Sequence, residues 1–178
     1  MKNLFKNNLF ALLLGLIDGI LTVLALVTGH VLTSEGMPIT LSLALKVAFA
    51  TTVSGAFIYF FSEYSRQHTH LIHAEKQLNL ASHGKLATTQ LGKRILKDSL
   101  RGVIISSICN FSSAMIPMIV ALIFPTMQWI ALIIALIMLV TVGIGIAHLT
   151  YGSATKWSIS LLAAGCFVAY IGYKLNVI

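Results

Sequence analysis

Long apolar runs separated by short polar connections are the dominant pattern of this chain. Five of these runs approach the ~20 residues that an α-helix needs to cross the hydrocarbon core of a bilayer. The predicted membrane-spanning helices cover about residues 9–32, 43–64, 102–124, 129–149 and 157–175. Three of the four connections are short, so consecutive helices should pack antiparallel. The pattern therefore predicts an all-α membrane protein with a single transmembrane domain over residues 1–178.

Composition supports the same class of protein. Hydrophobic residues make up 57% of the 178 residues and charged residues only 10%, whereas soluble domains are about one quarter charged. The two cysteines, Cys109 and Cys166, form neither a disulfide framework nor a zinc-binding spacing. We therefore expect a membrane protein that is not an enzyme and that holds no permanently bound cofactor.

Basic residues gather beside the apolar runs rather than in a nucleic-acid-binding motif. The formal charge of +7 is therefore explained by membrane topology, and we expect no nucleic-acid partner. Only the segment 65–101 is a long extramembrane connection. It contains Arg66, Lys76, Lys85, Lys93, Arg94, Lys97 and Arg101. With Lys2, Lys6 and Lys156 they lie on one side, against Lys46 and Lys174 on the other. The positive-inside rule places the N-terminus in the cytoplasm and the C-terminus outside or in a lumen.

Asp18 lies inside the first apolar run, within Gly15-Leu16-Ile17-Asp18-Gly19. A carboxylate in the middle of a membrane helix costs roughly 2.5 to 3.5 kcal/mol on insertion scales, so it normally faces the bundle interior, an ion path or a cation. Packing does not require a carboxylate at this position. Asp18 is therefore the strongest candidate for a functional residue.

Small and polar residues form one face on each of the first three predicted helices. On the first helix they are Gly15, Asp18, Thr22, Ala25 and Gly29, at steps of three and four. On the second they are Thr52, Gly55, Tyr59 and Glu63, and on the third Ser106, Asn110, Ser113 and Pro117. Each face serves either as a close-packing seam or as the lining of a polar path. Pro117 also frees a backbone carbonyl near Ser113, which a neighbour or a cation would satisfy.

Histidines gather in the segment 65–101, where His68, His70, His73 and Glu75 are candidates for capturing metal on the cytoplasmic side. His70 and His73 lie one helical turn apart, but no pair has the spacing of a closed zinc site. The alternative is a solvated face whose charge changes with pH.

Motifs in the first three helices resemble those of the vacuolar iron transporter family, in its compact prokaryote-type form. The residues 15–29 are similar to the family's first-helix motif of Gly, Asp-Gly, Ala-Leu and Gly. Ser54-Gly55-Ala56 and Ser62-Glu63-Tyr64 resemble its Ala-Gly-Ala and Gly-Glu-Tyr segments, and Ala114-Met115-Ile116-Pro117-Met118 resembles its Gly-Ala-Leu-Ile-Pro-Leu segment. Thr51 and Tyr59 occupy the positions where the family pattern has Glu and Met.

The resemblance implies a homodimer that exports ferrous iron or manganese from the cytosol in exchange for protons, with the metal path between the subunits. It also implies that Asp18 is a pathway ligand. We expect Glu63 to form the cytoplasmic entrance and Thr22, Tyr59 and Asn110 to supply further oxygen ligands. Two Asp18 carboxylates facing one path would repel each other and hold a proton that an arriving dication displaces.

The compact chain favours the inner (plasma) membrane of a bacterium or an archaeon. Loss of the Glu and Met of the family pattern at Thr51 and Tyr59 leaves one alternative open, a non-transporting scaffold or assembly subunit on the same fold.

Overall fold

The computed structural model describes the backbone of residues 2–33, 40–77, 90–124, 127 and 129–175, and the side chains of residues 9–29, 40–73, 90–124, 127 and 129–174. The described part of the chain is all-helical. Its helices are α1 (Lys2–Thr33), α2 (Leu41–Gln77), α4 (Gln90–Ile123), α5 (Trp129–Thr150) and α6 (Ala154–Leu175). Each contains a stretch long and apolar enough to cross a membrane. These five helices indicate a multi-pass integral membrane protein.

Three helices are longer than predicted, and one of them is α1, which begins at Lys2 instead of near residue 9. α2 continues to Gln77 instead of ending near residue 64, and α4 begins at Gln90 instead of near residue 102. Most of the predicted extramembrane segment 65–101 is therefore helical. Residues 65–77 contain neither Gly nor Pro, so nothing in their local chemistry stops a helix that the apolar run has already begun. Hydropathy detects the apolar part of a helix and does not predict whether the helix continues into a polar segment.

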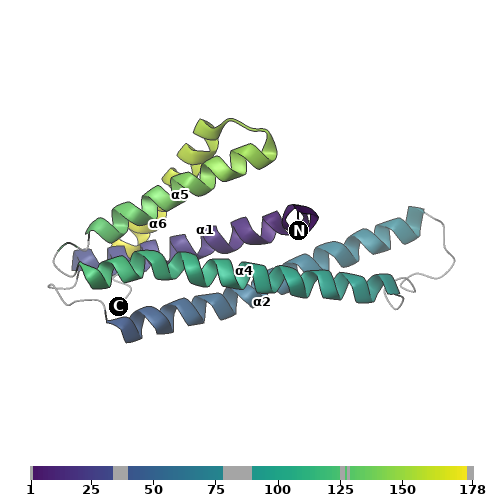
Figure 1. Ribbon diagram of the computed structural model, residues 1–178, viewed down its shortest axis with the longest axis horizontal. Helices are drawn as coiled ribbons and strands as arrows, with labels where there is room; N and C mark the ends of the chain where they lie inside the picture. Colours follow the sequence, from purple (N-terminus) through teal and green to yellow (C-terminus); the bar gives the residue numbers. More distant parts are fainter. Residues whose placement is uncertain (1, 34–39, 78–89, 125–126, 128, 176–178) are drawn as a thin grey trace.

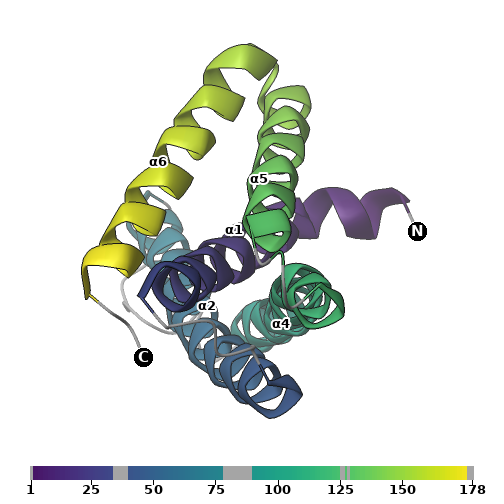
Figure 2. The ribbon, with the colours of Figure 1, turned by 90° about the vertical axis from the view of Figure 1, so that its left-hand side faces the viewer.

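α1 is the central helix of the bundle. It packs most extensively against α4 and also contacts α2, α5 and α6, which surround it when the molecule is viewed end-on (Figure 2). α2 and α4 run side by side along the length of the molecule, whereas the α5–α6 hairpin diverges from them toward its turn (Figure 1). The helix that carries Asp18 thus contacts each of the other four described helices.

Two apolar clusters hold α1 in this position. Val23 and Val27 pack with Ala48 of α2 and Met118 of α4, while Ile20 and Leu24 pack with residues of α5 such as Leu139. Met115 packs against the first cluster as well, so the two methionines beside Pro117 fill space in the core, the usual role of methionine.

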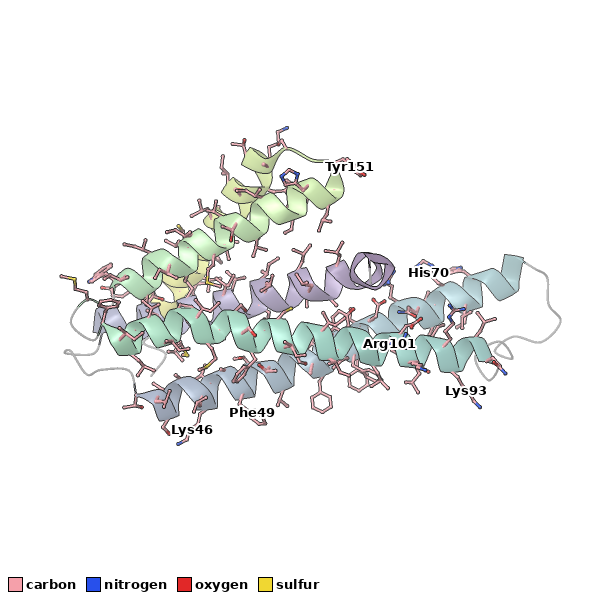
Figure 3. All side chains as sticks on the ribbon, viewed as in Figure 1. Lys46, Phe49, His70, Lys93, Arg101 and Tyr151 are labelled. Atoms are coloured by element: carbon pink, nitrogen blue, oxygen red, sulfur yellow. The ribbon has the colours of Figure 1, made fainter. Side chains whose placement is uncertain are left out.

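The outer surface of the helices is also apolar. α2 exposes Phe49, Phe57 and Phe61, and α6 exposes Phe167 and Tyr170. Phe49 projects away from the bundle (Figure 3). Soluble monomers rarely show continuous apolar patches of this kind, whereas side chains that face lipid are expected to be apolar.

The turn between α5 and α6 has a specific backbone cause. Tyr151 adopts a positive φ of 53°, and the N–H of Gly152 donates to the carbonyl oxygen of Ala147 at 3.0 Å. This is the six-to-one hydrogen bond of a Schellman motif, with Tyr151 in the left-handed position that glycine usually takes. It ends α5 and turns the chain back into α6.

Candidate functional site

Asp18 meets a polar partner from another helix in the middle of the bundle. The side-chain amide of Asn110 on α4 donates a hydrogen bond from Nδ2 to Asp18 Oδ2 at 2.7 Å. Gly55 of α2 lies against the same pair, because a Cβ built on Gly55 would be 2.9 Å from both Asn110 Nδ2 and Asp18 Oδ2. The structure therefore brings together one member from each of the three small and polar faces predicted from the sequence.

Glycines on α1 make this contact possible. A Cβ on Gly15 would collide with the backbone of Ser106, and one on Gly19 would collide with Ser113 Oγ and come within 2.5 Å of the carbonyl oxygen of Asn110. Small residues let two membrane helices approach closely. Because α1 and α4 approach this closely, the short side chains of Asp18 and Asn110 can meet across the interface.

Asn110 is itself buried, with 2% of its surface exposed. Its Oδ1 atom is buried and accepts no hydrogen bond within the described part of the chain. A buried acceptor without a donor costs free energy and calls for an explanation such as a bound water or ion. This oxygen lies against α1, where a Cβ on Gly19 would be 3.1 Å from it.

A groove of about 540 Å³ reaches Asp18 from the side of α1 that α4 does not cover. Its walls come from α1, α2, α5 and α6 and consist of Phe10, Leu13, Leu14, Ile17, Asp18, Leu21, Gly55, Ile58, Ile146, Thr150 and Trp157. Asp18 is the only charged residue among them. Among the described side chains no basic residue forms an ion pair with Asp18, and its carboxyl group accepts a hydrogen bond from Asn110.

Beyond Asp18 the bundle is closed. Val23 and Leu24 are fully buried and Val27 is 1% exposed, in the two clusters that pack α1 against its neighbours. Thr22, one turn after Asp18, donates its hydroxyl to the carbonyl oxygen of Asp18 at 2.8 Å. The groove is therefore open along the first half of α1 and ends against tightly packed side chains.

Glu63 belongs to a separate polar cluster near the polar end of α2. Arg66 binds both carboxylate oxygens, with Nε 2.9 Å from Oε2 and an Nη2–Oε1 distance of 2.7 Å. Gln67 adds a hydrogen bond to Oε1 at 2.5 Å. Glu63 is 8% exposed, and both of its oxygens are occupied. Both carboxylate oxygens therefore accept hydrogen bonds from Arg66 and Gln67. The role of Glu63 as an entrance ligand stays a prediction.

Tyr59 lies with the Glu63 cluster rather than with Asp18. Its ring packs on Gly102 of α4, where a Cβ would lie 2.5 Å from the Tyr59 hydroxyl oxygen. Gly55, which touches Asp18, and Glu63 are separated by eight residues, or about 12 Å along an α-helix. Asp18 with Asn110, and Tyr59 with Glu63, thus form two separate groups.

The histidines do not assemble a metal site with the other described side chains. No group of three or more His, Cys, Asp or Glu residues lies close enough to hold a metal among the residues whose side chains are described. His68 contacts the ring of Tyr64, with 6.0 Å between centroids. His70 lies at the end of the molecule that also carries Lys93 and Arg101 (Figure 3). The side chain of Glu75 lies outside the described residues, and its role stays a prediction.

The Glu63 cluster leads to a stability prediction with a matched control. Arg66→Gln leaves the Glu63 carboxylate, whose side chain is 10% exposed, without its cation. We expect the free energy of unfolding to fall by about 1 kcal/mol or more. Arg101→Gln removes an exposed pair with a 3.6 Å separation, worth about 0 to 1 kcal/mol. Thermal unfolding in detergent should show a larger loss for Arg66→Gln, and equal losses would mean that the bidentate contact is not formed.

Sequence reasoning missed several residues of the groove and of the Glu63 cluster. Trp157 and Thr150 line the groove from α6 and the end of α5, and no periodicity on their own helices indicates this. The pairing of Glu63 with Arg66 is readable from their spacing of three residues, once the helix is known to continue past residue 64.

Comparisons of the chain with protein-family models, with curated proteins and with solved structures find no match. The resemblance to the vacuolar iron transporter family therefore remains a prediction drawn from the motifs of the first three helices.

Proposed function

We propose that this protein is a transporter that exports a divalent transition metal, ferrous iron or manganese, from the cytosol in exchange for protons. The observation that carries the proposal is the state of Asp18. It is a carboxylate in the middle of an apolar helix, it has no basic partner among the described side chains, and it lies in a groove that closes just beyond it. A membrane carboxylate of this kind is a functional residue by default.

The proposed orientation follows the distribution of charge. Lys93 and Arg101 lie at one end of the molecule and Lys46 at the other (Figure 3), and the positive-inside rule assigns the end richer in Lys and Arg to the cytoplasm. In this orientation the groove, which starts near Phe10 and the α5–α6 turn, opens toward the cytoplasm. The packed layer around Val23 and Leu24 blocks the outer half, so the conformation corresponds to an inward-open state.

The described part of one chain offers few ligands for a divalent metal ion beside Asp18. Asp18 and Asn110 offer a carboxylate and one amide oxygen, whereas ions such as ferrous iron and manganese are held by several oxygen or nitrogen ligands. A homodimer with two such grooves facing each other would double this set, and isologous pairing is the commonest oligomeric arrangement. Exposed apolar side chains beside the groove, Phe10 and Ile58, suit such a contact.

Proton coupling follows from the same pair of carboxylates. Two Asp18 side chains at one path would share a proton because like charges in a poorly solvated site repel each other. A dication that binds must displace this proton, since metal ligands have to be deprotonated. One site would thus alternate between binding metal and binding a proton. We propose the inner membrane of a bacterium or an archaeon as the location of the protein.

Transport by the reconstituted protein tests the proposal. We expect proteoliposomes to take up ferrous or manganous ions faster when the lumen is more acidic than the medium, because protons leaving the lumen drive metal inward. Collapsing the pH difference with an ionophore should slow uptake to the level of an equal-pH sample. Uptake no faster than that of protein-free liposomes, over a panel of ferrous, manganous, cobalt and zinc ions, would reject metal transport.

The alternative function, a non-transporting scaffold, is favoured by one observation. Both oxygens of Glu63 are bound by Arg66 and Gln67, as expected for a carboxylate that only stabilises a helix. A ligand that binds the folded state raises its apparent stability. A scaffold should therefore show no metal-dependent shift of its thermal unfolding temperature in detergent, whereas a transporter should be stabilised by the ion it carries.

A further inference from the structure

The groove beside Asp18 has a lining that suits a ligand other than a bare metal ion. Its walls are formed by apolar side chains of four helices, and Asp18 is its only charged residue. The volume of about 540 Å³ lies within the range of about 300 to 1,000 Å³ typical of sites for small organic molecules. We propose that this groove binds an amphipathic organic cation, a monovalent ammonium or phosphonium ion with an apolar body, through Asp18.

Charge complementarity selects a cation. Asp18 Oδ2 accepts a hydrogen bond from Asn110, and within the described residues no ion pair neutralises the carboxylate. A carboxylate at the wall of an apolar groove favours a ligand that brings a positive charge. A neutral lipid chain would fill the same space but would leave that charge unbalanced.

The groove of a single chain favours a weakly hydrated organic cation, whereas the metal site proposed above takes ligands from two subunits. A metal dication must exchange its water shell for several ligands, whereas the groove offers the Asp18 carboxylate and mainly hydrocarbon. An ammonium or phosphonium ion that carries apolar groups is weakly hydrated, and it needs only a counter-charge and apolar walls.

Aromatic side chains add a further attraction. Trp157 and Phe10 both line the groove, and aromatic faces bind quaternary ammonium groups through cation–π interactions. Trp157 also provides a local signal, because a bound aromatic ion changes its fluorescence. The second tryptophan, Trp129, is 56% exposed at the start of α5 and does not line the groove.

The organic cation would occupy the groove that leads to the proposed metal site, but its binding does not depend on metal transport. The experiment uses the full chain in detergent with Trp129→Phe, so that Trp157 is the only tryptophan. The probe is tetraphenylphosphonium, and tetraphenylborate serves as the anion of matching shape. We expect saturable quenching by the cation, with at least about a tenfold weaker affinity in Asp18→Asn, since the charged partner is lost. Asp98→Asn, a matched carboxylate outside the groove, should bind as the parent does.

Ile17→Phe fills the groove while keeping Asp18, and it should also weaken binding of the cation. This second variant keeps the test decisive even where Asp18→Asn does not fold, which circular dichroism would show. Equal affinity of parent, Asp18→Asn and Ile17→Phe would overturn the inference. Equal affinity for the cation and the borate anion would also overturn it and would indicate a groove for lipid or a second copy of the chain. Metal flux in liposomes, measured separately, reports on the proposed function alone.

Discussion

Asp18→Asn should reduce proton-coupled metal uptake by proteoliposomes by about 100-fold or more, since even indirect partners of a metal ligand are worth 10- to 100-fold. The amide keeps the size of the carboxylate and can still pair with Asn110 across the 2.7 Å contact. It lacks the charge that would attract a dication and the proton that the dication would displace. Initial rates of uptake, with and without a pH difference, measure both losses.

Asp98→Asn is the matched control for this experiment. Asp98 is on α4, its side chain is 48% exposed, and among the described residues it pairs with Arg101 at 3.6 Å. Its loss should leave uptake within about twofold of the parent, because an exposed pair contributes little. Full activity in Asp18→Asn would remove Asp18 from the mechanism, and equal losses in both variants would point to a general effect of net charge.

The small and polar faces of the first three predicted helices contain the residues that meet at Asp18. Asp18, Gly55 and Asn110 belong to different faces, and the structure brings them into contact. This is predictable in principle, since a carboxylate in an apolar run must find a polar neighbour and small residues mark the faces that approach closely. The periodicity within each helix therefore predicts which faces meet at Asp18.

The remaining features depend on contacts that periodicity does not encode. Whether Glu63 is open to a cation depends on Arg66 and Gln67, and these residues reach it only because α2 stays helical past the apolar run. The groove depends on the divergence of the α5–α6 hairpin (Figure 1), which is a property of tertiary packing. The hydropathy of α5 and α6 predicts that they cross the membrane and leaves their tilt undetermined.

The close approach of α1 and α4 is the structural condition for the site, and Gly19 is the residue that tests it. A Cβ at Gly19 would collide with Ser113 Oγ and lie 2.5 Å from the carbonyl oxygen of Asn110. The backbone of α4 cannot move away at this point without disturbing the Asp18 contact. We expect Gly19→Ala to lower the free energy of unfolding by about 1 to 3 kcal/mol, the usual cost of overpacking a core.

Gly145→Ala separates this packing effect from the general preference of helices for alanine. Gly145 lies inside α5, and a Cβ there would meet nothing within 4 Å, so alanine should stabilise the helix by up to about 1 kcal/mol. Unfolding of both variants in mixed micelles of increasing denaturing detergent should shift in opposite directions. If Gly19→Ala shifted with Gly145→Ala, α1 and α4 would lie farther apart than they do here. Asp18 would then lose its contact with Asn110, and the site would no longer be built across these two helices.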